Sequence, residues 1–320
     1  MKECAAMTLP APALVLLNPR AAGGRAQVLS EPLTRWLQAH APGVSCVATD
    51  GIEAARATIR QQAPGSRIVL VGGDGTVHQM LPALVEQGCE LALVPLGSGN
   101  DCARALGMAG LDWDAALALA LRAPATPMDL GRCRAEGRTI WFASSLTAGF
   151  DSAVGERALR GPAHLRGLPR YLWATLGELA FLRHWPMTIT CDGQVLHAGP
   201  VLFASVLNTP SYGSGMPVVP QARIDDGRLD LLLAGPFSRI GTALMLPRML
   251  AGRHLGHPLV RIAPFAALEI RSPVDVPLAG DGEPAGTARA WQITVEPGAL
   301  CVVRCADNLP GQQQQQPGRA

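Results

Sequence analysis

The sequence predicts an α/β domain built on a parallel sheet, followed by an antiparallel β-sandwich domain. Within the first 107 residues, three apolar runs each lead into a polar turn and then a helical stretch, and strands that alternate with helices form parallel sheets. The second half instead contains many short apolar runs separated by turn residues, which is typical of a sandwich. A proline-flanked, polar segment at 127–138 separates the two patterns and is expected to be a loop.

Each strand–turn–helix unit of the first half can be located. The strands are expected at 14–17, 68–71 and 91–96, and the helices at 26–39, 77–85 and 102–106. The turns between them read Asn18-Pro19 through Gly23-Gly24, Gly72-Gly73-Asp74-Gly75-Thr76 and Gly97-Ser98-Gly99-Asn100-Asp101. Turns that follow parallel strands all lie at the carboxyl edge of the sheet, where ligands bind.

The turn at 72–76 carries the most specific chemistry. Its glycines let the backbone come close to a ligand, and the helix that follows offers free N–H groups and a positive dipole end to an anion. Asp74 could hold a metal ion through water, or it could simply cap a tight turn. Three polar turns at one edge favour a nucleotide or another polyphosphate. The sequence contains neither G-x-x-x-x-G-K-[ST] nor a G-x-G-x-x-G after the first strand, which excludes the two commonest nucleotide fingerprints.

Composition excludes several classes of protein. The net charge of +2 is too small for a nucleic-acid footprint, and no run of 18 apolar residues predicts a membrane-spanning helix. The eight cysteines are scattered and have no histidine partners, so we expect free thiols in the cytoplasm and no zinc site. Because Lys2 is the only lysine, bound phosphate must be met by backbone N–H groups, Mg²⁺ or arginine.

The second half is expected to contain seven short strands and two helical stretches. The strands are predicted at 139–146, 187–190, 201–207, 230–233, 268–271, 291–295 and 301–304, and the helices at 155–182 and 238–254. Asp192-Gly193 predicts a hairpin turn. The glutamine-rich sequence after Pro310 predicts a disordered tail.

Six motifs, in order, resemble the diacylglycerol kinase catalytic-domain family, which includes bacterial diacylglycerol and lipid kinases and is related to sphingosine and ceramide kinases. They are Asn18-Pro19 through Gly24, residues 72–76, Pro95 through Arg104, Ala148-Gly149-Phe150-Asp151, Asn208 through Asp230, and Asp281-Gly282-Glu283-Pro284. The turn at 72–76 is shared with NAD kinases. Residues 95–104 are similar to the PLGTxNDFAR element of lipid kinases and disfavour an NAD kinase.

The resemblance implies an NAD-kinase-like α/β domain over 1–130, a β-sandwich domain over 131–307 and a disordered tail over 308–320, with the active site in the cleft between the domains. It also implies that the last strand returns to the first domain. The expected activity is ATP- and Mg²⁺-dependent phosphorylation of a lipid hydroxyl, with diacylglycerol as the default acceptor. A sphingoid base, a ceramide-like lipid, and a catalytically silent nucleotide- or lipid-binding regulator stay open as alternatives.

The site residues follow by position from the resemblance. The nucleotide-binding residues would be Asn18, Thr49, Gly72, Gly73, Asp74, Gly75, Thr76, Val77, His78, Ser98, Asn100 and Asp101. Glu283 would be the general base, and Asp281 would help to hold the metal or only shape the turn. Structural Mg²⁺ would be bound by Asp226 with main-chain oxygens of Arg223 and Arg228. Two departures stand out, since His78-Gln79 replaces the usual Asn-Glu and Ser98 replaces the usual Thr.

The acceptor is expected to be a lipid presented at a membrane surface by a cytoplasmic protein, either peripheral at the inner membrane face or free; a homodimer stays open. The stretch 156–184 carries several arginines among apolar residues. It either lies on an anionic membrane surface or forms a helical hairpin on the sandwich with a solvated basic face.

Overall fold

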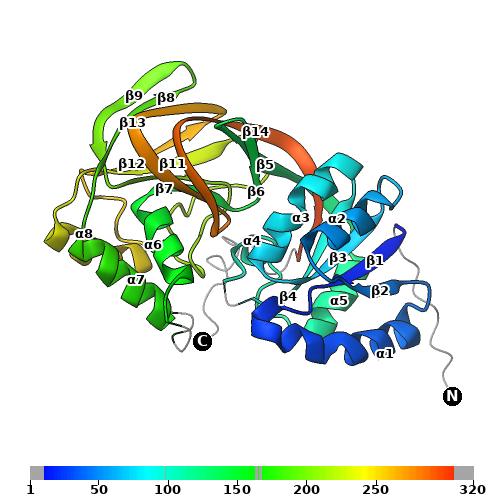
Figure 1. Ribbon diagram of the computed structural model, residues 1–320. Helices are drawn as coiled ribbons and strands as arrows, with labels where there is room; N and C mark the ends of the chain where they lie inside the picture. The colour runs from blue at the N-terminus through cyan, green and yellow to red at the C-terminus, as the bar shows by residue number, and fades with distance from the viewer. Residues whose placement is uncertain (1–10, 98, 163–164, 166–167, 306–320) are drawn as a thin grey trace, which may run out of the picture. The chain divides into compact units, whose positions relative to one another are not determined.

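The computed structural model describes residues 11–97, 99–162, 165 and 168–305, and these form two compact units. The first unit comprises residues up to Met128 together with the segment from Gly298, and the second spans Asp129–Pro297 (Figure 1). The tail expected to be disordered, 308–320, lies outside the described residues, as does Ser98.

The first unit is a parallel sheet with helices on both faces. Its strands are β1 (Ala13–Leu17), β2 (Ser45–Ala48), β3 (Arg67–Gly72) and β4 (Glu90–Pro95), in the order β4-β3-β1-β2. Every residue of β3 is buried, which explains why this central strand reads as a continuous apolar run. Beside β4, Val302 at the end of β14 (Glu283–Val303) pairs in parallel with Leu91 and extends the sheet.

Helices cover both faces of this sheet, α2 and α3 on one and α1 and α5 on the other (Figure 1). Their bounds are η1 (Ala21–Leu29), α1 (Ser30–His40), α2 (Ile52–Arg60), α3 (Asp74–Gln87), α4 (Asp101–Ala105) and α5 (Trp113–Arg122). The single helix expected over 26–39 is divided, because residues 26–29 belong to the 3-10 segment η1 and the α-helix α1 begins only at Ser30. Helix α3 ends at Gly88, whose left-handed backbone closes the helix.

A buried arginine joins three elements of this unit. Arg67, at the start of β3, is almost fully buried and forms an ion pair with Glu90 on β4 at 2.8 Å. Its Nη1 donates to the carbonyl oxygens of Ala120, Leu121 and Ala123 at the end of α5. These carbonyls have no partner within the helix, so the guanidinium both satisfies them and fixes α5 against the sheet.

The strand pairs of the second unit whose register is defined among the described residues are antiparallel. The strands are β5 (Ala125–Ala135), β6 (Arg138–Phe142), β7 (Ser145–Gly149), β8 (Trp185–Cys191), β9 (Gln194–Val201), β10 (Phe203–Leu207), β11 (Leu229–Ala234), β12 (Val260–Phe265), β13 (Ala267–Gly280) and β14. Strand β13 changes partner along its length, pairing with β8 at 268–271 and with β7 at 278–280. This change carries it from one layer of strands to the other.

Three helices pack on these strands: α6 (Phe150–Leu159), α7 (Leu168–Ala180) and α8 (Arg239–Leu250). Helix α6 contacts β7 and β13, whereas α7 contacts α6 and α8. The continuous helix expected over 155–182 was wrong, because the structure has two helices separated at Gly161-Pro162.

Two other expectations fail for identifiable reasons. The segment 127–138 is not a loop: β5 runs through it, and Gly131 lies directly under the ring of Phe142 on β6, where any side chain would collide. The strand expected over 139–146 is two strands, because residues 143–145 turn their N–H groups toward a carboxylate. The runs at 291–295 and 301–304 belong to the single long strand β14.

None of the helices described in the structure is long and apolar enough to cross a membrane.

Candidate active site

The turns after β3 and β4 touch through their backbones. A side chain on Gly73 would lie 3.0 Å from the Cα of Gly97, and one on Gly97 would lie 2.9 Å from the Cα of Gly73. Only glycine fits at either position, so the two turns approach more closely than any other residue pair would permit.

Asp74 ties the same two turns together. Its carboxylate accepts hydrogen bonds from the backbone N–H of Asp101 at 3.0 Å and of Cys102 at 3.1 Å, at the start of α4. Asn100 precedes them in a left-handed conformation and donates from Nδ2 to the carbonyl oxygen of Gly97 at 2.6 Å. Asp74 therefore caps a neighbouring helix, and the N-terminus of α3 is held beside that of α4.

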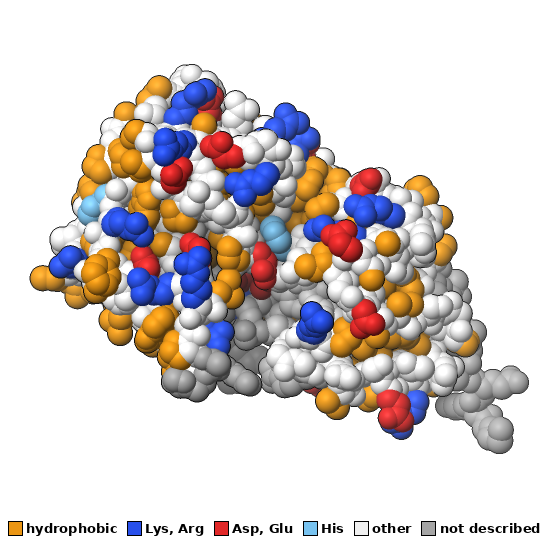
Figure 2. Space-filling model, viewed as in Figure 1, with side chains coloured by type: hydrophobic (Ala, Val, Ile, Leu, Met, Phe, Trp, Pro, Cys, Tyr) orange, Lys and Arg blue, Asp and Glu red, His pale blue; other side chains and the backbone are white. Residues whose placement is uncertain are grey.

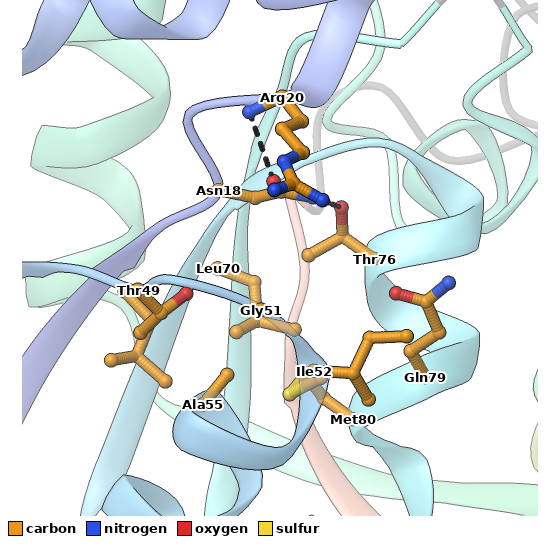
Figure 3. Close-up of a pocket in the computed structure, with 11 residues that line it drawn as sticks. Asn18, Arg20, Thr49, Gly51, Ile52, Ala55, Leu70, Thr76, Gln79 and Met80 are labelled. Atoms are coloured by element: carbon orange, nitrogen blue, oxygen red, sulfur yellow. Dashed lines mark hydrogen bonds between the residues drawn. The ribbon is translucent and has the colours of Figure 1, made fainter.

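The turn after β1 joins this assembly through Asn18. Its Nδ2 donates to Oγ1 of Thr76 on α3 at 3.0 Å, and its Oδ1 accepts from the backbone N–H of Arg20 at 3.1 Å (Figure 3). The backbone N–H of Asn18 also donates to the carbonyl oxygen of Val71. The ends of β1 and β3 are thus connected by side chain and backbone alike.

A pocket of about 230 Å³ opens beside these turns, with the polar side chains of Asn18, Thr49 and Thr76 around it (Figure 3). Its remaining lining residues are Leu16, Arg20, Gly51, Ile52, Ala55, Leu70, Gln79 and Met80. Complete small-molecule sites occupy roughly 300–1,000 Å³. This mostly apolar pocket is therefore large enough for only one part of a nucleotide, such as the base.

The structure thus brings together most residues predicted to bind the nucleotide. Asn18, Thr49 and Thr76 line the pocket, and Gly72 to Asp74 lie in the turn beside it. Val77 is buried in the core side of α3, His78 is half-buried on that helix, and Ser98 lies outside the described residues. Sequence reasoning missed Arg20 and Gln79, which line the pocket. Arg20 directly follows Asn18-Pro19, and its position in this turn could have indicated that it lines the site.

In the second unit, Glu283 follows a two-residue hairpin turn between β13 and β14. Asp281 and Gly282 both have positive φ, at 47° and 84°, and Gly280 pairs with Glu283 across the turn. Positive φ at both central residues defines the type I′ turn, which matches the twist of the flanking strands and favours Asp-Gly. Glu283 is therefore placed at the first residue after a rigid turn.

The two carboxylates of this turn are used differently. Asp281 accepts hydrogen bonds from the backbone N–H groups of Ala143 at 3.0 Å, Ser144 at 2.7 Å and Ser145 at 3.0 Å. These bonds hold the hairpin against the start of β7. Glu283 is half-buried and makes no hydrogen bond or ion pair to any described residue. Of the two, Asp281 shapes the turn, and the Glu283 carboxylate has no partner among the described residues.

Hydrogen bonds continue from this hairpin to the turn at 225–228. Asn208 is fully buried, and its Nδ2 donates to the carbonyl oxygens of Ala143 at 2.9 Å and Asp129 at 2.7 Å. The Asp129 carboxylate accepts the backbone N–H of Gly227 at 2.7 Å. Sequence reasoning missed Asp129. Its polar position between the apolar residues Met128 and Leu130, on a segment interpreted as a loop, gave no strand pattern to reveal it.

The turn at 225–228 fits a magnesium ion by its chemistry. Asp226 is exposed, and its Oδ1 accepts the backbone N–H of Arg228 at 3.0 Å. Burial, followed by the negative charge of Asp226, raises the pKa of Asp230 to about 6. Among the described residues no three acidic, histidine or cysteine side chains converge on one point. A cation would therefore depend on backbone carbonyls beside Asp226, as predicted for Arg223 and Arg228.

A second carboxyl group with a raised pKa, that of Asp151, lies where α6 begins. Asp151 Oδ2 accepts hydrogen bonds from the Tyr212 hydroxyl at 2.6 Å and the Ser205 hydroxyl at 3.1 Å. Burial raises the pKa of Asp151 to about 6, and the two hydrogen bonds offset only part of that rise. Tyr212 belongs to the segment 208–216, so this carboxyl anchors the segment to α6 and β10.

Comparison with known proteins identifies the family. Residues 12–133 match the model of the diacylglycerol kinase catalytic domain, and residues 144–304 match the YegS C-terminal NAD kinase beta sandwich-like domain. The chain therefore belongs to the diacylglycerol kinase family of lipid kinases. The resemblance inferred from the six motifs and the predicted fold class, an α/β domain followed by an antiparallel sandwich, are both confirmed.

Individual relatives support the same family. A diacylglycerol kinase from Mycobacterium tuberculosis is 32% identical over 265 residues, which cover 82% of this chain and 84% of the relative. A protein from Pseudomonas aeruginosa named "Probable lipid kinase YegS-like" is 34% identical over 249 residues, covering 73% and 75% of the two chains. Among solved structures, a diacylglycerol kinase from Bacillus anthracis str. Sterne has a TM-score of 0.69 at 21% identity and covers 93% of this chain and 98% of its own.

The Asp151 carboxyl predicts a pH-dependent stability. Its folded-state pKa of about 6 exceeds the value of roughly 3.9 in an unfolded chain, so between these values the folded state binds more protons and stability falls as pH rises. Asp151→Asn keeps an acceptor for Tyr212 and Ser205 but cannot ionise. Above about pH 6 the variant should be more stable than wild type, by at most about 3 kcal/mol, and below about pH 4 the difference should vanish. Urea unfolding across this range tests it; parallel wild-type and variant curves would contradict it.

Proposed function

We propose that this lipid kinase transfers the γ-phosphate of ATP to the hydroxyl of diacylglycerol, giving phosphatidic acid. Family membership establishes the kinase class and implies ATP as the phosphate donor. The choice of diacylglycerol follows the name of the M. tuberculosis relative. The P. aeruginosa relative is named only as a lipid kinase, so another hydroxyl lipid, such as a sphingoid base or a ceramide-like lipid, is the alternative acceptor.

The half-buried Glu283 carboxylate is the observation that carries the proposal. In the transfer, the acceptor hydroxyl oxygen bonds to the γ-phosphorus, the bond to the β–γ bridging oxygen breaks, and ADP leaves. The hydroxyl proton must pass to a base. Glu283 is fixed by the hairpin and makes no hydrogen bond to a described residue, so both its oxygens are open to that proton. Asp281, with three backbone N–H groups on its carboxylate, orients the turn instead.

The first unit would hold the nucleotide. The pocket lined by Asn18, Thr49 and Thr76 would take the base, and the turn at 72–76 would place the phosphates against the N-terminus of α3. Arg20, which is exposed and lines the pocket, would offer paired N–H groups to a phosphate. In this reading, Asp74 acts on the phosphates indirectly, by fixing the two turns that surround them.

Magnesium would be held in the second unit by the Asp226 carboxylate and the main-chain oxygens of Arg223 and Arg228. When bound, the ion supplies positive charge to the acidic turn at 225–228. The hydrogen bonds through Asp129, Asn208 and Ala143 connect that turn to the Glu283 hairpin. The ion would therefore act on catalysis by ordering the base.

Purified protein should transfer labelled phosphate from ATP to diacylglycerol in detergent micelles when Mg²⁺ is present. A panel of diacylglycerol, sphingosine, ceramide and NAD distinguishes the acceptors. We expect the largest kcat/KM with diacylglycerol. Transfer only to sphingosine or ceramide would establish the alternative acceptor, transfer to NAD alone would overturn the proposal, and no transfer with retained ATP binding would indicate a silent regulator.

Replacing Glu283 by glutamine should remove the base and little else. Glutamine keeps the size of the side chain but cannot accept the proton, so kcat should fall by roughly 10²- to 10⁴-fold. Because Glu283 supports no other residue in the described structure, ATP affinity and the melting temperature should stay at wild-type values. Steady-state kinetics, ATP titration and thermal unfolding measure the three quantities.

Asp281→Asn is the matched control, since it changes the neighbouring carboxylate of the same turn. It turns an amide toward three backbone N–H groups and should lower stability by about 2–3 kcal/mol, as expected for lost hydrogen bonds to a charged group. A Glu283→Gln enzyme with near wild-type kcat would eliminate Glu283 as the base.

Asp226→Ala should lower both activity and the melting temperature if Asp226 binds Mg²⁺. A bound ion stabilises the folded state, so EDTA should lower the melting temperature of wild type by a few degrees and leave that of Asp226→Ala unchanged. Added Mg²⁺ should not rescue the variant. Asp225→Ala, at the adjacent exposed carboxylate, is the control and should still respond to EDTA. Equal responses of wild type and Asp226→Ala would exclude this residue as a ligand.

A further inference from the structure

Helix α7 has its apolar stripe on the outside. Leu172, Trp173 and Leu176 lie three and four residues apart, on one face of the helix, and all are exposed, Leu176 at 66%. Tyr171, near the start of α7, is exposed as well, and so is Phe181, which follows the last residue of the helix and is 71% exposed. A surface helix of a globular protein normally turns its apolar stripe toward the core, so this orientation requires an explanation.

The opposite face of α7 places a charged side chain, that of Glu178, toward the interior of the protein. Glu178 is buried, and it accepts a hydrogen bond from Nε of Arg157 on α6 at 2.6 Å. The Arg157 side chain crosses α7 at Gly177, where any side chain would lie 2.9–3.0 Å from it. This partly buried ion pair fixes the rotation of α7 about its axis and keeps the apolar stripe turned outward.

Helix α8 extends the same surface. Ile240 and Leu244, one turn apart, are exposed at 74% and 60%, and Leu250 at the end of the helix is exposed at 55%. The end of α7 meets the start of α8, where His184 Nε2 is 2.8 Å from the carbonyl oxygen of Phe237. We call the exposed residues of the two helices the α7–α8 surface: Tyr171, Leu172, Trp173, Leu176, Phe181, Arg183, Arg239, Ile240, Leu244, Arg248, Leu250 and Arg253.

The charge of this surface is of one sign. Arg183, Arg239, Arg248 and Arg253 are exposed and make no ion pair with described residues. Residues 235–259 contain no Asp or Glu, and the one acidic residue of α7 is the buried Glu178. Where Figure 1 places α7 and α8, Figure 2 shows orange hydrophobic and blue basic side chains side by side, with red acidic side chains toward α6. The other arginines of the stretch 156–184 in the described structure are engaged internally: Arg157 with Glu178, Arg160 with Glu156, and Arg170 with the carbonyl oxygen of Leu165.

We propose that the α7–α8 surface docks the protein on an anionic lipid bilayer. Leucine, tryptophan and phenylalanine side chains would enter the interfacial region of the bilayer, while the four arginines contact acidic headgroups. The inference rests on the proposed function only in that a lipid acceptor resides in a bilayer. The surface itself is identified from exposure and charge.

A second copy of this chain fits the same surface poorly. In a two-fold dimer a patch at the axis meets its own copy, so the arginines of one copy would face the arginines of the other with no exposed carboxylate between them. An anionic bilayer supplies the missing charge. Charge complementarity therefore selects the bilayer over self-association.

Sedimentation of the full chain with vesicles tests the proposal without ATP or an acceptor lipid. The protein should bind vesicles of equal parts phosphatidylglycerol and phosphatidylcholine, and bind vesicles of phosphatidylcholine alone much more weakly. Because exposed charges are screened within about 10 Å at 0.1 M salt, binding to the anionic vesicles should weaken as salt is raised. Equal binding to both kinds of vesicle at all salt concentrations would overturn the electrostatic part.

Paired variants locate the docking surface. Arg239→Glu with Arg248→Glu should weaken binding to anionic vesicles by at least about tenfold, since each arginine near an anionic surface contributes roughly fivefold. Arg35→Glu with Arg122→Glu makes the same change of charge at exposed positions in the first unit and should not weaken binding. Equal losses in the two pairs would show that only net charge matters and would overturn the proposal.

A second pair of double variants tests the apolar residues of the α7–α8 surface. Leu176→Ser with Leu244→Ser should weaken vesicle binding at both low and high salt, whereas Val195→Ser with Val274→Ser, exposed on strands of the same unit, should not. All four side chains are exposed, so the melting temperature should stay unchanged. Light scattering that reveals a dimer which the leucine variants dissociate would assign the surface to a second copy.

Failure of the proposed function is separable from failure of docking. If wild type binds anionic vesicles through this surface but phosphorylates no lipid in micelles, the docking surface stands and the kinase assignment fails. If it phosphorylates diacylglycerol in micelles but the surface variants bind vesicles like wild type, the kinase stands and the docking proposal is wrong.

Discussion

Hydrogen bonds from backbone N–H groups to aspartate carboxylates hold three of the turns in the candidate site in place. Asp74 accepts from residues 101 and 102, Asp281 from residues 143 to 145, and Asp129 from Gly227. Each bond joins segments distant in sequence, and hydrogen bonds to a charged acceptor are roughly twice as strong as neutral ones. Without them, turns that contain few apolar side chains would have little else to fix their geometry. The motifs that resemble those of a kinase therefore also connect separate segments of the fold.

Because the motif residues also hold the fold together, part of the structure could be predicted from the sequence. The runs before residues 18, 72 and 97 are short, apolar and bounded by glycines, so the strands, the turns and their common edge were all predictable. The split of the expected strand at 139–146 was not, because it depends on the Asp281 carboxylate 136–138 residues away. Strand β5 was missed for a related reason. By itself, Gly131 disfavours a strand. It is needed there because the ring of Phe142, on the neighbouring strand, occupies the space that a side chain would take.

The same limit applies to the direction in which a helix faces. The apolar residues of α7 recur with helical periodicity. This periodicity predicts an apolar stripe along the helix, but it does not predict whether the stripe faces the core or the outside. By default an apolar stripe is assigned to the core. Here the Arg157–Glu178 pair occupies the inner face, and α7 packs on α6 and α8. Arginine-rich sequence likewise does not distinguish a solvated face from internal pairing: Arg67 is buried among carbonyls, whereas Arg239 is exposed.

The distribution of bonds among carboxylates also separates structural from chemical roles. The Asp281 carboxylate accepts three backbone N–H groups, so its oxygens are engaged within the protein. Glu283, two residues later, is held by the same hairpin yet accepts no bond from the described residues. The hairpin thereby gains rigidity through the Asp281 side chain and leaves the Glu283 carboxylate without a described partner, which is the arrangement that the proposed general base requires.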